Sequence, residues 1–200
     1  ISGSATNSDW VIHIPGLGTE NYIYPHYRIQ LSVGAGANGM VPDANLVEIS
    51  TGVATNTSGA THMAYSFKNT PGLCKIGTYV GNSSTNGAYV STGFRPRWLW
   101  IFNTTLTSAD AERPIFDTAR YKFNGTTTAG GSNGGVNFSD QRAAEEAQNT
   151  SLGANPAIDI LADGFKLRAN DSTINTATTY LYISMADIAG NGTLPPIYGR

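Results

Sequence analysis

Residues 97–102 read R-W-L-W-I-F and are apolar at every position after the first. Side chains alternate between the two faces of an extended strand. One face would therefore carry Trp98, Trp100 and Phe102, and the other would carry Leu99 and Ile101. A strand that is apolar on both faces is typical of the centre of a sheet that is covered on both sides. We therefore expect this stretch to form a central strand.

Most of the other periodic segments also alternate with a period of two, which is the period of a strand. They lie at residues 27–33, 46–50, 62–67, 75–81, 87–92, 113–117, 164–168 and 178–185. Gly, Asn, Ser, Thr and Pro fill the connections, at the spacing expected for an all-β sandwich or barrel. We predict antiparallel β-sandwich modules, jelly-roll-like and arranged in tandem. The short link N-S-S-T-N further predicts that 75–81 and 87–92 pair as a hairpin.

One segment departs from the strand period. Residues 139–149 read S-D-Q-R-A-A-E-E-A-Q-N, with a Ser or Asp that can cap a helix and a run of helix-forming residues behind it. The apolar positions of this segment are all alanine, so we expect a short helix on the surface.

Two stretches match without a gap when residues 45–68 are placed on residues 163–186, an offset of 118 positions. The matched apolar positions are Val47 with Phe165, Ile49 with Leu167, Met63 with Leu181, Tyr65 with Ile183 and Phe67 with Met185. More loosely, residues 7–13 resemble residues 109–117. We interpret the match as a tandem repeat, in which Met63, Tyr65 and Phe67 point inward from a strand.

This interpretation divides the chain into three parts. Residues 1–72 would be the C-terminal part of a first β repeat, residues 73–188 a complete second repeat, and residues 189–200 an extended C-terminal tail. No counterpart of the Trp-rich strand precedes residue 7. A partial repeat would leave strand edges bare, so we expect preceding residues or a neighbouring chain to complete the first repeat.

The charge content of the chain is low. Only 13% of the residues are charged, about half the usual share, and the net charge is −2. A protein that binds nucleic acid needs a basic surface, so we expect no nucleic-acid partner. The sequence has no apolar run of eighteen residues, and we expect no membrane insertion.

We expect no cofactor and no metal. Cys74 is the only cysteine, which excludes an internal disulfide, and the three histidines His13, His26 and His62 lack zinc-ligand spacing. The segment G-A-G-A-N-G at 34–39 has the glycine spacing of a dinucleotide-binding loop. That site needs a helix to begin at once, whereas Pro42 and a non-helical segment follow, so we interpret these residues as a hairpin loop.

We expect no enzymatic activity and assign no catalytic residue. The chain contains none of the common nucleophile, zinc-protease or phosphate-loop motifs. A glycosidase would need two carboxylates in a cleft. Asp117, Asp159, Asp163 and Asp171 are available, but each lies beside turn residues, where an aspartate commonly caps backbone amides. The sequence alone does not pair them.

Aromatic residues in a polar loop are the feature with the most binding potential. Tyr22, Tyr24 and Tyr27 cluster in N-Y-I-Y-P-H-Y. The apolar and rigid face of an aromatic ring suits stacking on a sugar ring. Packing in the core or at an interface with a sister chain explains these tyrosines equally well, so they are candidate glycan or interface contacts.

Four stretches together resemble a domain of unknown function found in virion proteins of tailed bacteriophages, especially marine and cyanobacterial phages. They are K-I-G-T-Y-V-G-N-S-S-T-N-G-A-Y-V-S-T-G-F-R-P-R-W-L-W-I at 75–101, P-I-F-D-T-A-R at 114–120, D-G-F-K-L-R at 163–168 and T-A-T-T-Y-L-Y-I-S-M-A at 176–186. The resemblance covers about residues 74–187 and carries no catalytic residues. It implies a structural or adhesin role in tail-fibre or tail-tip proteins.

We therefore expect a virion structural protein of a bacteriophage, exposed on the particle surface. It would form a module of a tail fibre or tail tip that acts in assembly and in recognition of a host-surface glycan. Its partners would be other virion proteins and further copies of itself, as a homotrimer. Two alternatives stay open, a capsid decoration or head-fibre protein and a fragment of a polysaccharide depolymerase.

Overall fold

The computed structural model describes residues 58–59, 61–105, 113–118 and 158–186, together with the short strands β1 to β5 and β10. The chain forms two compact units. Unit 1 comprises residues 1–66 and 107–109, and unit 2 comprises residues 67–106 and 110–200. Each unit is described by itself below.

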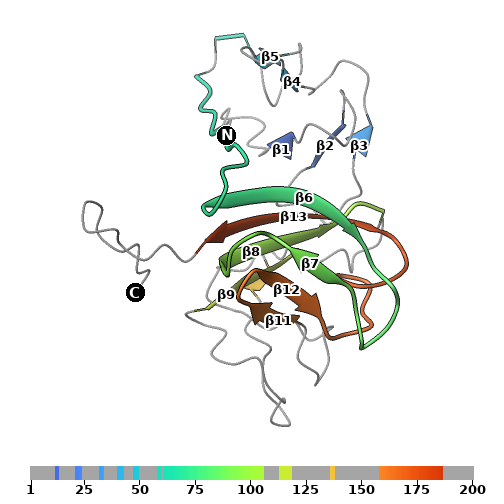
Figure 1. Ribbon diagram of the computed structural model, residues 1–200. Coiled ribbons are helices and arrows are strands. Elements are labelled where there is room, and N and C mark those ends of the chain that lie inside the picture. Colours follow the sequence, from blue (N-terminus) through green and yellow to red (C-terminus); the bar gives the residue numbers. More distant parts are fainter. Residues whose placement is uncertain are drawn as a thin grey trace, which may run out of the picture. The chain divides into compact units, whose positions relative to one another are not determined.

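Unit 2 contains two antiparallel sheets (Figure 1). Its strands are β6 (Cys74–Val80), β7 (Tyr89–Ser91), β8 (Pro96–Asn103), β9 (Pro114–Asp117), β10 (Val136–Asn137), β11 (Ile158–Leu161), β12 (Gly164–Leu167) and β13 (Thr179–Ala186). The larger sheet has the order β10-β9-β8-β13-β6, and the smaller sheet has the order β11-β12-β7. No described residue is helical, and the prediction of an all-β antiparallel fold is confirmed.

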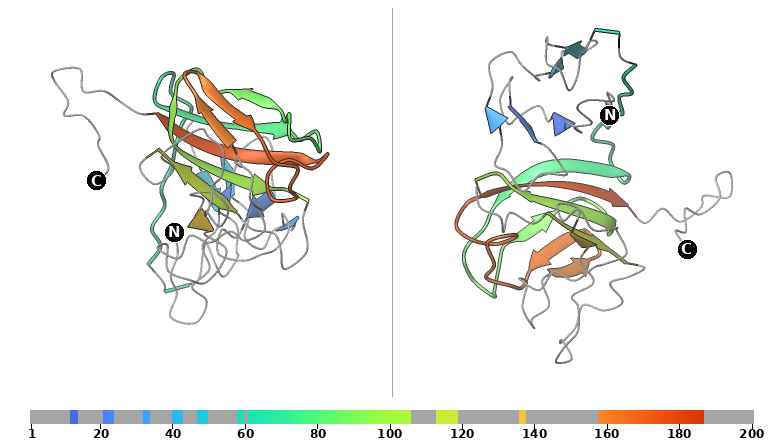
Figure 2. Two further views of the ribbon diagram at one scale, coloured as in Figure 1. Left: turned by 90° about the horizontal axis from the view of Figure 1, so that it is seen from below. Right: turned by 180° about the vertical axis from the view of Figure 1, so that it is seen from behind.

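One apolar cluster joins the two sheets of unit 2. The larger sheet contributes Tyr79, Leu99, Ile101, Phe116, Tyr180 and Tyr182, and the smaller sheet contributes Val90, Ile158, Ile160, Phe165 and Leu167. The views in Figure 2 show the smaller sheet lying across one face of the larger sheet. Because these residues alternate along their strands with residues of the opposite face, each strand supplies one of its two faces to the core.

The central position of β8 confirms the prediction for residues 97–102. β8 pairs with β9 on one side and with β13 on the other. Leu99 and Ile101 belong to the shared core, and Phe102 on the opposite face is also fully buried. The ring of Trp100 lies 4.4 Å from that of Phe102, so the second face carries an aromatic row as well.

Tyrosines at the centre of the core combine ring stacking with satisfied hydroxyl groups. Tyr79 and Tyr180 are cross-strand neighbours whose rings stack at 5.1 Å. The Tyr79 hydroxyl donates to the carbonyl of Ile174 at 2.7 Å, and the Tyr180 hydroxyl donates to the carbonyl of Ser172 at 2.9 Å. A buried hydroxyl that lacked such a partner would lower stability.

Because these tyrosines are buried, we expect the protein to lose stability at alkaline pH. Burial raises the pKa of Tyr79 well above the ordinary value, and it also raises the pKa of Tyr180 and Tyr182. Above pH about 10, unfolded tyrosines lose their protons while these three keep theirs, so stability falls as the pH rises. Burial lowers the pKa of Arg113 to about 10, which makes stability rise with pH. This is the effect of one group, whereas three tyrosines make stability fall.

We expect the absorbance change of phenolate formation to coincide with loss of the β-sheet circular dichroism signal as the pH is raised above about 10. Tyr79→Phe should make the fall in stability with pH less steep. The explanation would be wrong if all tyrosines ionised while the sheet signal stayed intact.

The predicted hairpin of residues 75–81 and 87–92 is wrong. β6 pairs with β13 in the larger sheet, whereas β7 pairs with β12 in the smaller sheet. The link between them crosses from one sheet to the other and is held by Asn175. The side chain of Asn175 accepts from the backbone N–H of Asn82 at 3.0 Å and donates to the carbonyls of Ser84 at 2.7 Å and Ala169 at 2.9 Å. These bonds satisfy the backbone of the link without strand pairing.

Unit 1 contains a three-stranded antiparallel sheet and a two-stranded hairpin. Its strands are β1 (Ile12–His13), β2 (Asn21–Ile23), β3 (Ser32–Val33), β4 (Met40–Pro42) and β5 (Val47–Ile49). The sheet has the order β1-β2-β3, and β4 pairs with β5. The hairpin pairs Met40 with Ile49 and Pro42 with Val47. At an offset of 118 these four positions become Ile158 with Leu167 and Ile160 with Phe165, which is the register observed between β11 and β12.

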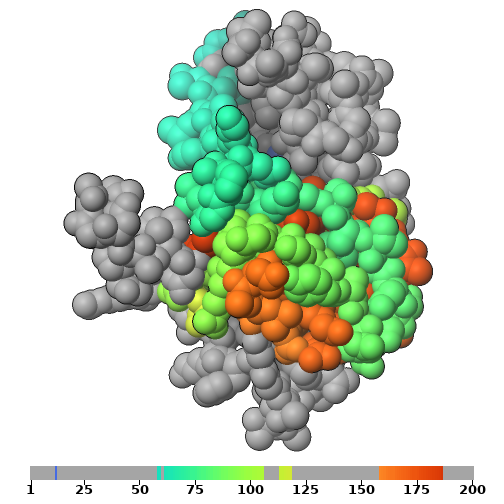
Figure 3. All heavy atoms as spheres, viewed as in Figure 1, coloured from blue at the N-terminus to red at the C-terminus, as the bar shows by residue number. Residues whose placement is uncertain are grey.

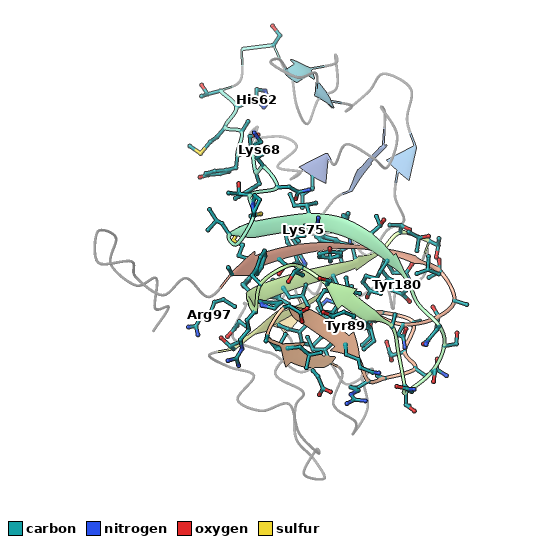
Figure 4. The ribbon with its side chains drawn as sticks, viewed as in Figure 1. His62, Lys68, Lys75, Tyr89, Arg97 and Tyr180 are labelled. Carbon is teal, nitrogen blue, oxygen red and sulfur yellow. The ribbon has the colours of Figure 1, made fainter. Side chains whose placement is uncertain are left out.

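The predicted strand at residues 62–67 is wrong. His62 forms a single bridge, and residues 63–69 belong to no strand. Met63, Tyr65 and Phe67 do not point inward, because each is more than half exposed. Figure 4 shows His62 and Lys68 along this extended segment. A strand needs hydrogen-bonded neighbours, and among the described residues none pairs with 63–69.

The predicted helix at 139–149 and the predicted tail at 189–200 lie outside the described residues.

Candidate binding surface on the three-stranded sheet

The outward face of the sheet β11-β12-β7 carries a polar row with one exposed aromatic ring. Asp159 on β11 is the cross-strand neighbour of Lys166 on β12, which is in turn the neighbour of Tyr89 on β7. Each of the three alternates with a core residue of its own strand, so the row lies on the face away from the core. Figure 3 shows this sheet as the adjoining orange and light green spheres on the viewed face.

Tyr89 is the aromatic member of the row, and its side chain is 49% exposed. Interaction with the carboxylate of Asp163 is the main cause that raises the pKa of the Tyr89 hydroxyl. Asp163 lies in the turn between β11 and β12. Figure 4 labels Tyr89 on the sheet β11-β12-β7.

An ion pair borders the row at β11. The guanidinium Nε of Arg168 lies 2.5 Å from Oδ2 of Asp159, with Arg168 more exposed than Asp159. The pair orients the Asp159 carboxylate beside Lys166, its cross-strand neighbour. The face therefore carries, in one line across three strands, a half-exposed aromatic ring, a partly exposed ammonium group and a carboxylate that is 13% exposed and held by a guanidinium.

This arrangement is suited to an uncharged polar ligand with an apolar face. A sugar ring can place its C–H groups on the tyrosine ring while its hydroxyls accept from the lysine and donate to the carboxylate. The face is built on paired strands, which hold side chains more firmly than loops do.

The predicted candidates Tyr22, Tyr24 and Tyr27 belong to unit 1, whereas this face belongs to unit 2. Tyr22 lies in β2, where its backbone pairs with His13 and Ser32. Tyr24 and Tyr27 lie outside the described residues. A role of these three tyrosines in glycan or interface contacts stays a prediction.

The aspartates considered for a glycosidase pair occupy distinct places. Asp159 is in the ion pair, and the Asp163 carbonyl accepts from the backbone N–H of Thr92 at 2.8 Å. The Asp171 carboxylate accepts from the backbone N–H of Thr173 at 2.8 Å, as a turn cap does. Asp117 is buried at the end of β9.

No group of three or more His, Cys, Asp or Glu side chains in the described part of the chain is arranged to hold a metal ion. Cys74 is a free, buried thiol, and burial raises its pKa. Within the same residues, no helix has the length and apolar character required to cross a membrane.

Sequence reasoning missed Tyr89, although the sequence holds a signal for it. In G-A-Y-V-S-T, the strand period places Tyr89 and Val90 on opposite faces, so that one of them must face away from the core. Which one is exposed depends on the pairing of β7 with β12, and the pattern of β7 alone does not contain that information.

Comparison with known proteins identifies a family for this chain. No curated protein and no solved structure matches the chain. One family model, described as a domain of unknown function (DUF7483), matches residues 1–188. Since this match spans both units and nearly the whole sequence, the chain belongs to the DUF7483 family.

Proposed function

We propose that the chain is a structural module of a tailed-bacteriophage virion that recognises a host-surface glycan and takes part in assembly. In this proposal the two sheets form an antiparallel β-sandwich, jelly-roll-like, in a tail-fibre or tail-tip protein exposed on the particle. The resemblance of residues 74–187 to virion proteins supports the phage assignment. The chain would work as a trimer, alongside other virion proteins.

The row of Asp159, Lys166 and Tyr89 is the observation that carries the glycan role. It combines an exposed ring with a donor and an acceptor on a rigid sheet, within a chain of low charge. Low charge suits a neutral saccharide better than a strongly charged ligand, because few charged groups would have to be desolvated on binding.

Loss of the Tyr89 ring should weaken glycan binding. We expect Tyr89→Ala to reduce binding to an array of bacterial surface polysaccharides by about tenfold, which corresponds to the stacking energy of one aromatic ring. Thermal stability should change little, since the side chain is half exposed. The matched control is Tyr65→Ala, which removes an exposed tyrosine from outside this face and should leave binding unchanged.

Equal binding by the wild-type chain and Tyr89→Ala would contradict the glycan role of this face.

Gold-labelled antibodies against the chain, applied to intact virions, separately test the position of the chain on the particle. Label on fibres or the tail tip is expected, whereas label over the head would favour a capsid decoration protein. Release of oligosaccharides from a bound polysaccharide would instead favour a depolymerase.

A further inference from the structure

The link of residues 81–88, which joins β6 to β7 (Figure 1), contains a chemically reactive pair of residues. Asparagine is among the thermolabile residues of proteins, and a following glycine hinders its backbone nitrogen least. Asn86 is followed by Gly87, and both residues belong to the described part of the chain. The sequence contains five such Asn-Gly pairs, which begin at Asn38, Asn86, Asn124, Asn133 and Asn191.

The reaction of such a pair is deamidation through a cyclic imide. The backbone nitrogen of Gly87 would attack Cγ of Asn86. A bond from this nitrogen to Cγ forms, the bond from Cγ to Nδ2 breaks, and Nδ2 leaves as ammonia with the proton of the Gly87 amide. Water then opens the imide at either of its carbonyls, which gives aspartate or isoaspartate. The attack requires the Gly87 nitrogen to come within about 3.5 Å of Cγ in the right orientation.

The fold engages the Gly87 amide elsewhere. Its N–H donates to the carbonyl of Leu167 on β12 at 3.1 Å, and the Leu167 N–H donates to the carbonyl of Ala88 at 3.0 Å. A Cβ on Gly87 would lie 2.6 Å from Cβ of Leu167 and 2.6 Å from Nδ2 of Asn175. A backbone packed this closely has no room to rotate toward the Asn86 side chain, so the bond to Leu167 and the packing both oppose the attack.

Asn82 and Ser84 hold Asn86 within the link. The Asn86 carbonyl accepts from Nδ2 of Asn82 at 3.1 Å, and the Asn86 N–H donates to Oγ of Ser84 at 3.1 Å. Asn86 itself is exposed, whereas Gly87 is buried. Water therefore reaches the reactive side chain, and the fold limits the reaction through the geometry of the backbone.

We propose that Asn86 is a conditional deamidation site, which is protected while the link 81–88 is closed and reacts when the link opens. Isoaspartate adds one methylene group to the backbone between Asn86 and Gly87. Because Gly87 is packed against Leu167 and Asn175, the lengthened backbone would not restore the bond from Gly87 to Leu167. A transient opening would thus become a permanent one. This proposal does not depend on the virion assignment or on the glycan role.

Peptide mapping by mass spectrometry measures the deamidation rate at Asn86 in the full chain, in a mildly alkaline buffer with and without guanidinium chloride. In the unfolded chain we expect Asn86 to react at a rate comparable to that of the other Asn-Gly pairs. In the folded chain we expect the rate at Asn86 to be at least about tenfold lower, because only the open state of the link reacts. Equal rates at Asn86 in the folded and the unfolded chain would overturn the proposal.

Asn82→Ala tests whether the bonds of the link provide the protection. It removes a side chain that donates to the Asn86 carbonyl and accepts from the Ser84 N–H. We expect the rate at Asn86 in the folded chain to rise about fivefold, the effect of losing one typical hydrogen bond, with no change in guanidinium chloride. An unchanged rate in folded Asn82→Ala would also overturn the proposal.

The matched control is Asn69→Ala, which removes an exposed asparagine side chain that bonds to the backbone of Ile76 on β6. It should leave the rate at Asn86 unchanged. Slow amide exchange in β13 reports that unit 2 is folded in each variant. Where Asn82→Ala does not fold, Ser84→Ala repeats the test, because it removes the hydroxyl that accepts from the Asn86 N–H.

The effect of the product is measured on chain that has reacted in guanidinium chloride and has then been refolded. The other four pairs are blocked by Asn38→Gln, Asn124→Gln, Asn133→Gln and Asn191→Gln. We expect rapid amide exchange at Gly87 and Leu167 in molecules that carry isoaspartate at position 86. Asn86→Asp, which has the new charge without the added methylene, should keep both amides protected. Equal protection of these amides in the two proteins would overturn the proposal.

Discussion

Phe165→Ala is expected to lower the free energy of unfolding by about 4 kcal/mol, the typical cost of removing a fully buried phenylalanine. The Phe165 side chain has no exposed surface. Its ring meets that of Tyr79 edge-on at 5.9 Å and that of Tyr182 edge-on at 5.4 Å, so one substitution removes contacts between the smaller and the larger sheet. Such a loss is a large part of the stability of an ordinary domain.

Phe67→Ala is the matched control, because it removes the same side chain from a position that is 56% exposed. We expect it to change the free energy of unfolding by no more than about 0.5 kcal/mol. Urea unfolding followed by circular dichroism measures both variants. Equal destabilisation by the two substitutions would contradict the assignment of Phe165 to the core and of Phe67 to the surface.

Asn175→Asp is expected to destabilise unit 2 by about 3 kcal/mol without changing the size of the side chain. Asn175 is fully buried, and its amide group donates to the carbonyls of Ser84 and Ala169. A carboxylate cannot donate, so it would face two carbonyl oxygens in a site without water access. The variant should regain stability as the pH falls toward about 4, because protonation restores one donor and removes the charge.

The control for this substitution is Asn86→Asp, at an exposed position in the same link. Its effect on the urea midpoint should be small at every pH. If Asn175→Asp were as stable as the wild-type chain at neutral pH, the bonds of Asn175 would not be what holds the link between the sheets.

Alternation along the chain predicts a strand well when the apolar residues of the strand itself are enough to define it. Residues 97–102 form an interior strand, with Leu99 and Ile101 buried on one face and Phe102 buried on the other. The strand at 178–185 is likewise present, as β13. In both cases most of the apolar residues that define the strand are buried.

The sequence fails where the outcome depends on a distant partner. T-H-M-A-Y-S-F-K and T-Y-L-Y-I-S-M-A have almost the same pattern, yet only the second forms a strand, since only it has β6 and β8 beside it. The link N-S-S-T-N resembles a hairpin loop, but bonds from Asn175, more than ninety residues away, direct it to another sheet. The short strand β11 was not predicted, because four residues are too few to show a strand pattern without the pairing with β12.

The candidate binding surface could be predicted only in part for the same reason. The strand period separates Tyr89 from Val90, and Asp159 from Ile160, but it does not say that Asp159, Lys166 and Tyr89 line up. That alignment results from the register of three strands, two of which are connected to the third through the rest of unit 2. Tyr22, Tyr24 and Tyr27 were chosen as candidate contacts from the composition of a loop, and composition contains no information about strand pairing.

Amide hydrogen exchange of the chain compares two segments that have nearly the same apolar pattern, one that forms the strand β13 and one, residues 63–68, that belongs to no strand. The measurement compares residues 63–68 with residues 181–186 in the same sample, so solution conditions are shared. We predict that exchange at 181–186 is slowed by several orders of magnitude and that exchange at 63–68 is close to the rate of an unstructured peptide. Protection of 63–68 comparable to that of 181–186 would contradict the account.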